Sequence, residues 1–140
     1  VANLQRGADR VAREGLTLVI EPINTRDMPG YFLSRTRQGL DVIADVGRPN
    51  LGLQFDLYHR AIIDGDVEAG LAEAKPQIKH MQIASPPDRG EPDQGDLDFK
   101  HLLGVIERSG YDGYIGLEYK PRAGTVPGLA WMKTLGLAAS

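Results

Sequence analysis

The sequence of 140 residues lacks several features that would point to particular classes of protein. It has no cysteine, which excludes disulfides and thiolate chemistry. Its 16 basic residues are scattered along a chain with a net charge of −3, so we expect neither nucleic acid nor an anionic membrane surface as a partner. No apolar stretch approaches the roughly 20 residues that a membrane span needs, and the first residues do not follow the pattern of a signal peptide.

Segments with helical and strand-like periodicity alternate along the whole chain, of which 41% is hydrophobic. The pattern predicts a helix over residues 1–14 and then four strands, each with a helix behind it. The strands are expected at 16–23, 51–57, 78–84 and 114–119, and the helices at 34–46, 66–75, 97–109 and 129–137, with Ser34, Asp66 and either Asp96 or Asp98 as N-caps.

This order of elements is typical of a parallel sheet in a single α/β domain with right-handed crossovers. Four strands are too few to close a barrel, which takes eight βα units. An open doubly wound sheet would show the same order of elements. No Gly-rich phosphate fingerprint follows any strand, so a nucleotide-binding Rossmann domain is a poor fit.

Each predicted strand delivers one oxygen-bearing side chain near its carboxyl end, the first of them in LTLVIEPIN. These residues are Glu21, Asp56, Gln82 and Glu118. In parallel α/β folds the carboxyl ends of the strands meet at one edge, where chemistry is assembled. Three carboxylates that converge there would repel one another without a cation, and oxygen ligands favour Mg²⁺ or Mn²⁺ over Zn²⁺. A single strand-end carboxylate is more often a helix cap or a solvated tip, so the pattern alone leaves both interpretations open.

Five stretches carry a resemblance to a known family. LVIEPIN, FDLYH, HMQIA, PDRGEPDQGDLDF and GLEYKP resemble hydroxypyruvate isomerase and its close relatives, which belong to the xylose-isomerase-like (β/α)8 barrels together with sugar 3-epimerases. The resemblance runs from Val1 to about Gly136. It implies that residues 1–140 are the C-terminal half of a single TIM barrel domain, strands five to eight, and that the N-terminal half is not in this chain.

The resemblance also implies roles for particular residues. Glu21, Asp56, Gln82 and Glu118 match the ligands of a divalent metal, Mg²⁺ or Mn²⁺, and Glu21 and Glu118 match the two glutamates that move the proton. Gln82 is the residue of the hydroxypyruvate isomerase group, whereas many epimerases have histidine there. Candidate substrate-binding residues are His59, Arg89, His80 and Lys120; the last three can equally be ordinary surface or interior residues.

The implied reaction interconverts hydroxypyruvate and tartronate semialdehyde, or a similarly small 2-oxo acid, through a cis-enediolate. One glutamate removes the proton and the other returns it to the neighbouring carbon. The carboxylate of the substrate needs a cation, and Arg89 can bind it in a bidentate way, with Lys120 and His59 as alternatives. The long loop from Ser85 to Gly95 is a candidate for closing over a bound substrate.

Two other interpretations stay open. The first is a ketose 3-epimerase of the same fold. The second is a non-catalytic half-barrel, because half of a barrel leaves two strand edges unpaired and would associate with itself or with an N-terminal half-barrel partner. We expect the protein to act in the cytoplasm on a small-molecule substrate.

Overall fold

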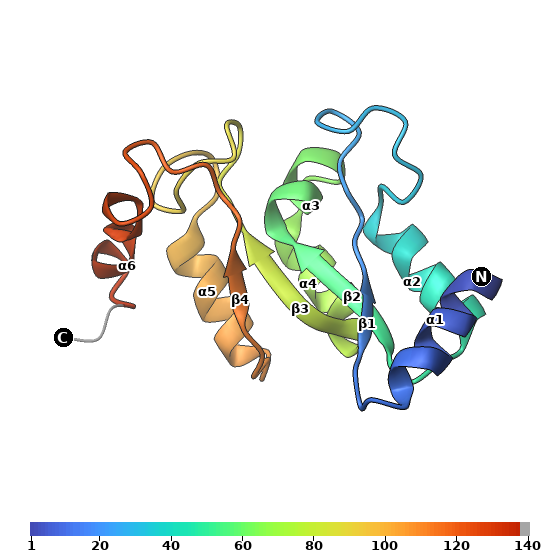
Figure 1. The fold of residues 1–140 in the computed structure, drawn as a ribbon. Coiled ribbons are helices and arrows are strands. Elements are labelled where there is room, and N and C mark those ends of the chain that lie inside the picture. Colours follow the sequence, from blue (N-terminus) through green and yellow to red (C-terminus); the bar gives the residue numbers. More distant parts are fainter. Residues whose placement is uncertain (138–140) are drawn as a thin grey trace.

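The four strands form one parallel sheet in the order in which they occur in the chain, β1-β2-β3-β4 (Figure 1). The structure, a computed structural model, describes residues 1–137. Its elements are α1 (Ala2–Ala12), β1 (Leu18–Ile20), α2 (Thr36–Val46), β2 (Leu51–Asp56), α3 (Leu57–Ile63), α4 (Val67–Ala74), β3 (Ile78–Ile83), α5 (Phe99–Arg108), β4 (Ile115–Leu117) and α6 (Trp131–Thr134), with short 3-10 turns at Lys75–Gln77 and Pro127–Leu129.

The strand order decides between the two parallel architectures that the sequence allowed. A doubly wound sheet reverses direction at a switch point, so that sequential strands end up on opposite sides of the first. Here the chain adds every strand on the same side of the last, as in the wall of a (β/α)8 barrel. The open doubly wound alternative is therefore wrong for this chain.

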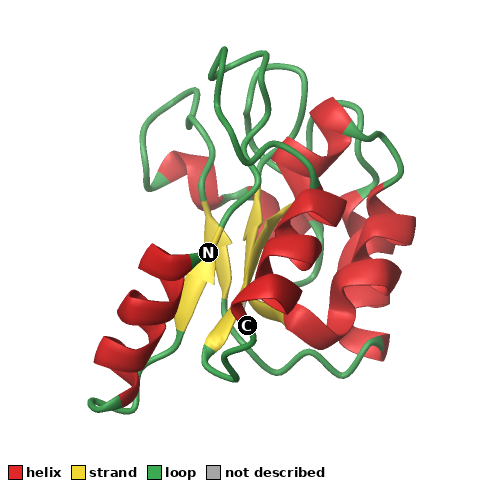
Figure 2. Ribbon diagram, turned by 90° about the vertical axis from the view of Figure 1, so that its right-hand side faces the viewer, coloured by secondary structure: helices red, strands yellow, loops and turns green. Residues whose placement is uncertain are grey.

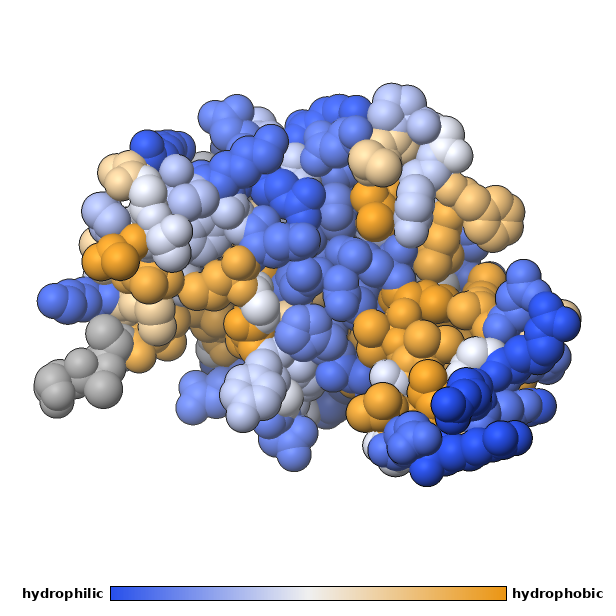
Figure 3. All heavy atoms as spheres, in the orientation of Figure 1, coloured by the Kyte–Doolittle hydropathy of each residue, from blue (hydrophilic) through white to orange (hydrophobic). Residues whose placement is uncertain are grey.

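The two faces of the sheet differ in character. Leu53 and Phe55 of β2 and Met81 and Ile83 of β3 are buried in the core beneath the main layer of helices (Figure 2). The side chains that alternate with them point to the opposite face, which lacks a helix layer. That face is turned toward the viewer in Figure 1 and is largely hydrophilic at its centre, with hydrophobic patches to either side (Figure 3).

A local irregularity aligns the polar residues of β2 and β3. Leu53 pairs with Ile78, but the next residue, Gln54, pairs with His80, so Lys79 is an extra residue in β3. The side chain of Lys79 lies over Gly52, where a Cβ atom would be 2.1 Å from its Cγ. As a result Asp56 and Gln82 stand at the same level at the carboxyl end of the sheet.

The predicted helix caps were partly right. Asp66 Oδ1 accepts from Ala69 N at 2.9 Å and Asp98 Oδ1 accepts from His101 N at 2.9 Å, so both aspartates are N-caps as predicted. Ser34 is not a cap, because α2 begins one residue later behind Arg35. No side chain caps α2, and Gln38 Oε1 accepts a hydrogen bond at 3.1 Å from Ser34 N, which precedes the helix.

Several element predictions were wrong or too long, among them the fourth strand, which covers only Ile115–Leu117 of the predicted 114–119. Helix α3 was missed, because the predicted strand ends at residue 57 and no element was assigned to residues 58–63. The first strand covers only Leu18–Ile20 of the predicted 16–23, and the last helix only Trp131–Thr134 of the predicted 129–137. Among the described residues, no helix is long and apolar enough to cross a membrane.

Candidate active site

The tight junction between β2 and α3 brings three titratable groups together at the carboxyl end of the sheet. Asp56 ends β2 and is also the N-cap of α3, since its Oδ1 accepts from Tyr58 N at 2.8 Å. The helix therefore begins at once and carries His59, 4% exposed, back over the strand ends. One ligand atom each of Glu21, Asp56 and His59 lies within 4.8 Å of the other two.

Gln54 links the ends of three strands. Its Nε2 donates to Glu21 Oε2 at 2.8 Å and to Gln82 Oε1 at 2.5 Å. Gln82 therefore presents its oxygen, not its nitrogen, to the centre of the sheet. No pattern in the sequence indicates that Gln54 joins these two residues.

Arg89 lies between two of the carboxylates. Its Nη2 donates to Glu118 Oε2 at 2.7 Å and lies 3.5 Å from Asp56 Oδ2, while its Nε donates to the backbone oxygen of Glu118 at 3.1 Å. The guanidinium also covers the Tyr58 ring, 5.1 Å from the ring centroid. Glu118, with its side chain 50% exposed, is thus connected to the buried carboxylates through Arg89 and is not itself part of the group of three.

The backbone of Arg89 is in a conformation that side-chain-bearing residues seldom adopt, with φ of 58°. Lys120 N donates to Arg89 O at 2.7 Å, and two residues further along the same loop Glu91 Oε1 accepts from Arg122 N at 2.8 Å. The loop after β3 is in this way fastened to the loop after β4. Such an unfavourable backbone at the edge of a site is a common mark of a residue placed for function.

The other two candidate substrate residues are placed differently. His80 lies on the same face as Gln82 but two residues earlier on β3, next to Gly116, where a Cβ would be 3.1 Å from His80 Nε2. Lys120 is exposed and contributes its backbone N–H to Arg89. Neither belongs to the group formed by Glu21, Asp56 and His59.

Burial and mutual repulsion shift the pKa values of the titratable side chains in the site so that their uncharged forms are favoured. Burial, with the nearby charges of Asp56 and Glu118, raises the pKa of Glu21 to about 7. Burial likewise raises the pKa of Asp56 to about 6, although the backbone N–H of Tyr58 opposes the shift. Burial and the adjacent Arg89 lower the pKa of His59 to about 4, so the imidazole is neutral at pH 7.

A cation would relieve this arrangement. Glu21 Oε1 is buried and has no hydrogen-bond partner, which is a costly state for a carboxylate oxygen. Asp56 Oδ2 and Gln82 Oε1 are further oxygen atoms at the same end of the sheet that can bind a metal ion. A set of oxygen donors with excess negative charge suits a hard divalent cation, so the residues present fit such an ion.

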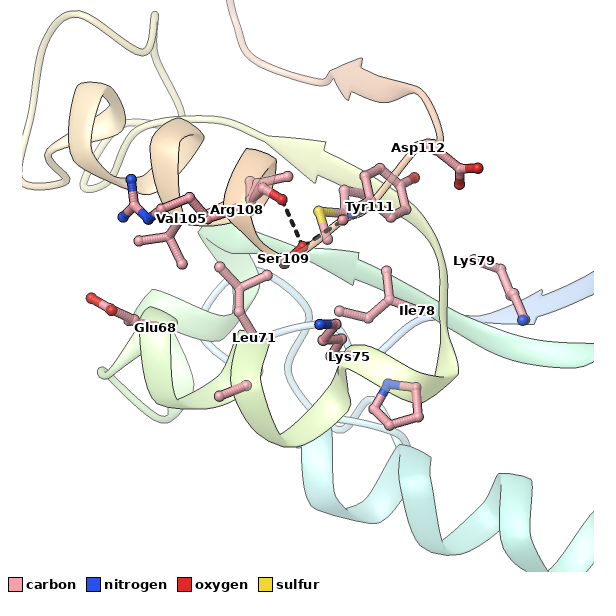
Figure 4. A pocket seen from close by; sticks show the side chains of 15 residues that line it. Glu68, Leu71, Lys75, Ile78, Lys79, Val105, Arg108, Ser109, Tyr111 and Asp112 are labelled. Carbon is pink, nitrogen blue, oxygen red and sulfur yellow. Dashed lines mark hydrogen bonds between the residues drawn. The ribbon is translucent and has the colours of Figure 1, made fainter.

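A cavity of about 480 Å³ lies away from these carboxylates, between the C-terminal ends of α4 and α5 (Figure 4). Apolar side chains such as Leu71, Ile78 and Val105 line it, and the charges around it are of both signs. The polar atoms of Ser109 are used locally, since its Oγ donates to Ile106 O at 2.6 Å. We assign this cavity no function.

No sequence motif marks a role for Asn24 and Asp27, which lie beside His59 and its neighbour Tyr58. Asn24 is fully buried and its Nδ2 lies 2.7 Å from His59 Nδ1, and Asp27 accepts a hydrogen bond from Tyr58 OH at 2.7 Å. Asn24 is part of the LVIEPIN motif, so the motif contained it. Its partner lies 35 residues away, and no periodicity links the two.

Parallel strands added in one direction, with polar side chains at their carboxyl ends, define a β/α-barrel type of enzyme fold. Residues 1–135 match the model of the xylose isomerase-like TIM barrel family, and the chain belongs to this family. It is 51% identical to 2-oxo-tetronate isomerase of Cupriavidus necator over 131 residues and 44% identical to hydroxypyruvate isomerase of Escherichia coli over 132 residues. These matches cover 94% of this chain in both cases, and 50% and 51% of the relatives.

The crystal structure of a protein from Brucella melitensis, described as AP endonuclease, family 2, is similar in three dimensions as well. Its TM-score is 0.92 at 44% identity, and the match covers 95% of this chain and 52% of that one. The chain thus spans about half the length of the relatives it matches. The suggestion of a small-acid isomerase family, made from the motifs, is confirmed.

Proposed function

We propose that this chain supplies strands five to eight of a xylose isomerase-like barrel and the acid–base and metal-binding residues of an isomerase. The substrate would be hydroxypyruvate, which becomes tartronate semialdehyde, or a similarly small 2-oxo acid. The observation that carries the proposal is the convergence of Glu21 and Asp56 around an unpaired, buried Glu21 oxygen. The identity of up to 51% to isomerases along nearly the whole chain supports it.

Four residues would hold the divalent cation, for which Mg²⁺ and Mn²⁺ are the candidates: Glu21, Asp56, Gln82 and Glu118. When bound, the ion supplies Lewis-acid stabilisation for negative charge that develops on substrate oxygens. Glu118 would first have to leave Arg89, to which it is paired at 2.7 Å. That exchange would free the guanidinium for the carboxylate of the substrate.

The isomerisation needs a proton to leave one carbon and return to its neighbour. Glu21 can accept or give a proton at neutral pH, because burial and nearby carboxylates raise its pKa to about 7. Glu118 follows β4 at the other edge of the sheet and is the second group of the pair. We propose that these two glutamates share the transfer, with no order assigned between them.

The first experiment is titration of Mn²⁺ into this chain by calorimetry, with Asp56→Asn beside the wild type. The amide retains an oxygen for Tyr58 N, so the start of α3 is preserved while the charge is removed. Asp66→Asn is the matched control, since Asp66 is also an N-cap but belongs to α4. We expect one ion per chain in the wild type and the control, and none in Asp56→Asn. A folded wild-type chain that binds no Mn²⁺ would contradict a site formed by these strands alone.

The relative with 51% identity favours a second substrate. 2-Oxo-tetronate and hydroxypyruvate are both 2-oxo acids, and the identity to 2-oxo-tetronate isomerase exceeds the 44% found for hydroxypyruvate isomerase. Comparison of kcat/KM for the two acids, in a barrel that contains this chain, distinguishes the two specificities. The proposed partners are thus a small acid and, for the open sheet, the N-terminal half of a barrel or a second copy of the chain. The cytoplasmic location stays a prediction.

A further inference from the structure

Asn24 is fully buried, and the backbone N–H of Asp27 fixes the orientation of its side-chain amide. Asn24 Oδ1 accepts from Asp27 N at 2.8 Å. A backbone N–H can only donate, so the atom that faces it must be the amide oxygen. The amide nitrogen therefore lies on the other side, where it donates to Asp27 Oδ2 at 3.1 Å.

The same amide nitrogen faces the ring of His59. Asn24 Nδ2 lies 2.7 Å from His59 Nδ1, and the backbone N–H of Asn24 donates to that same ring nitrogen at 3.3 Å. Two donors that converge on Nδ1 require a lone pair there. A neutral imidazole then carries its one proton on Nε2.

This Nε2–H points between the two carboxylates of the site. It lies 3.6 Å from Asp56 Oδ2 and 3.8 Å from Glu21 Oε1, which is too far for a hydrogen bond to either. A protonated ring nitrogen has no lone pair to offer a metal ion. His59 therefore lies among the potential ligands as a hydrogen-bond donor.

We propose that Asn24 is a positioning residue that holds His59 in the Nε2–H tautomer. The substrate-binding role that the family resemblance implies for His59 is then that of a hydrogen-bond donor to a substrate oxygen, and His59 is not a metal ligand. Asp27, which anchors the amide of Asn24, is itself held by Tyr58 OH at 2.7 Å. The substrate contact rests on the proposed function. The tautomer does not, because it follows from hydrogen bonds within the chain.

The tautomer is measured by long-range ¹H–¹⁵N NMR of the histidine rings in the metal-free chain at neutral pH. The chain has three histidines, so His80→Gln and His101→Gln variants assign the signals. We expect His59 to show a bare Nδ1 and a protonated Nε2. A protonated Nδ1, or a rapid mixture of both tautomers, overturns the proposal, and this result needs no variant of the site itself.

The role of Asn24 is tested by Asn24→Asp, which places a carboxylate opposite Nδ1 and should move a proton onto that nitrogen. Asn50→Asp is the control, because Asn50 also uses its Nδ2 for structural hydrogen bonds, to Ala8 O at 2.8 Å and Leu16 O at 3.2 Å, outside the site. We expect the His59 signals to change only in Asn24→Asp. Unchanged His59 signals in a folded Asn24→Asp chain would count against a positioning role.

Mn²⁺ calorimetry of His59→Gln tests whether His59 is a hydrogen-bond donor or a ligand of the metal ion. We expect the affinity to stay within about threefold of the wild type, whereas loss of a true ligand would cost far more than the 10–100-fold typical of supporting residues. Abolished binding in His59→Gln overturns the donor role. If the wild type binds no Mn²⁺, the proposed function fails while the NMR result still decides the tautomer.

Discussion

At the scale of single residues, Glu21 is the group on which most of the site depends. Its burial, its neighbours Asp56 and Glu118 and its unpaired oxygen all penalise the ionised form. A carboxyl whose pKa is higher in the folded than in the unfolded chain stabilises the fold below its ordinary pKa, and that contribution is lost as the pH rises through the folded value. For Glu21 the loss falls between about pH 4.5 and 7.

Replacement of Glu21 by Gln should therefore stabilise the metal-free chain at high pH. We expect the Tm of Glu21→Gln in a chelator to exceed that of the wild type by roughly 5 °C at pH 8, and the difference to vanish below the ordinary pKa of glutamate, at about pH 4. His59 and Asp56, with pKa values of about 4 and about 6, also titrate in this range and are present in both proteins. Thermal denaturation followed by circular dichroism checks this; an equal or lower Tm at pH 8 would show that Glu21 is not held in an unfavourable charge state.

Arg89 should compete with a metal ion for the same carboxylates. Its guanidinium is paired with Glu118 and lies near Asp56, so removal of the charge in Arg89→Gln frees both. We expect Mn²⁺ to bind up to about fivefold more tightly, which corresponds to the ~1 kcal/mol of a partly exposed ion pair. Arg108→Gln, on α5 and outside this group, is the control for net charge and should change the affinity little. Weaker binding in Arg89→Gln would mean that Arg89 organises the site for the ion.

The sequence predicted which residues stand at the strand ends, because the period of a strand and the parallel topology together fix that edge. It did not predict how they touch. Gln54 joins Glu21 to Gln82, and Arg89 joins Asp56 to Glu118, through side chains whose reach and rotamers depend on the packed structure. The pairing of Asn24 with His59 is a contact of the same kind.

At the scale of elements, prediction succeeded where a long apolar run or a charged cap marked the boundary, as at Asp66 and Asp98. It failed for α3, whose seven residues LYHRAII continue directly from β2 without a turn. The helix is specified by Asp56, which was assigned to the strand end and not recognised as a cap. At α2 the prediction of Ser34 as the cap was wrong, because Arg35 occupies the N-cap position and makes no side-chain capping bond.

Two glycines inside helices test how closely the helices pack on the sheet. A Cβ at Gly39 of α2 would be 2.8 Å from Cδ1 of the fully buried Leu53, whereas a Cβ at Gly7 of α1 would meet Leu18 Cδ2 at an ordinary 3.5 Å. We expect Gly39→Ala to lower the free energy of unfolding by about 1–2 kcal/mol through overpacking. Gly7→Ala should raise it by about 0.5–1 kcal/mol, because alanine favours the helix. Urea denaturation of both variants measures the difference, and a stabilising Gly39→Ala would show that α2 is free to move off β2.

At the scale of the whole molecule, the sheet has two open edges. Within residues 1–137, β1 pairs only with β2 and β4 only with β3, so the outer backbone groups of Leu18–Ile20 and Ile115–Leu117 lack strand partners. Large apolar side chains lie exposed at the β4 edge, among them Leu117 and Tyr114, the latter 89% exposed. Exposed edges with apolar side chains pair readily with another strand.

We therefore expect light scattering to give a mass above the 15.3 kDa of one chain, increasing with concentration. Leu117→Lys places a charge at the β4 edge and should shift the average mass toward that of the monomer. Val126→Lys is the matched control, since Val126 is a highly exposed apolar residue in the loop after β4, and it should leave the association unchanged.

If the wild type is a stably folded monomer of 15.3 kDa, the sheet tolerates its open edges, and the proposal that it must pair with a second half-barrel loses its physical basis. If association is lost in Leu117→Lys alone, it occurs through the β4 edge, where a closed barrel would add its next strand.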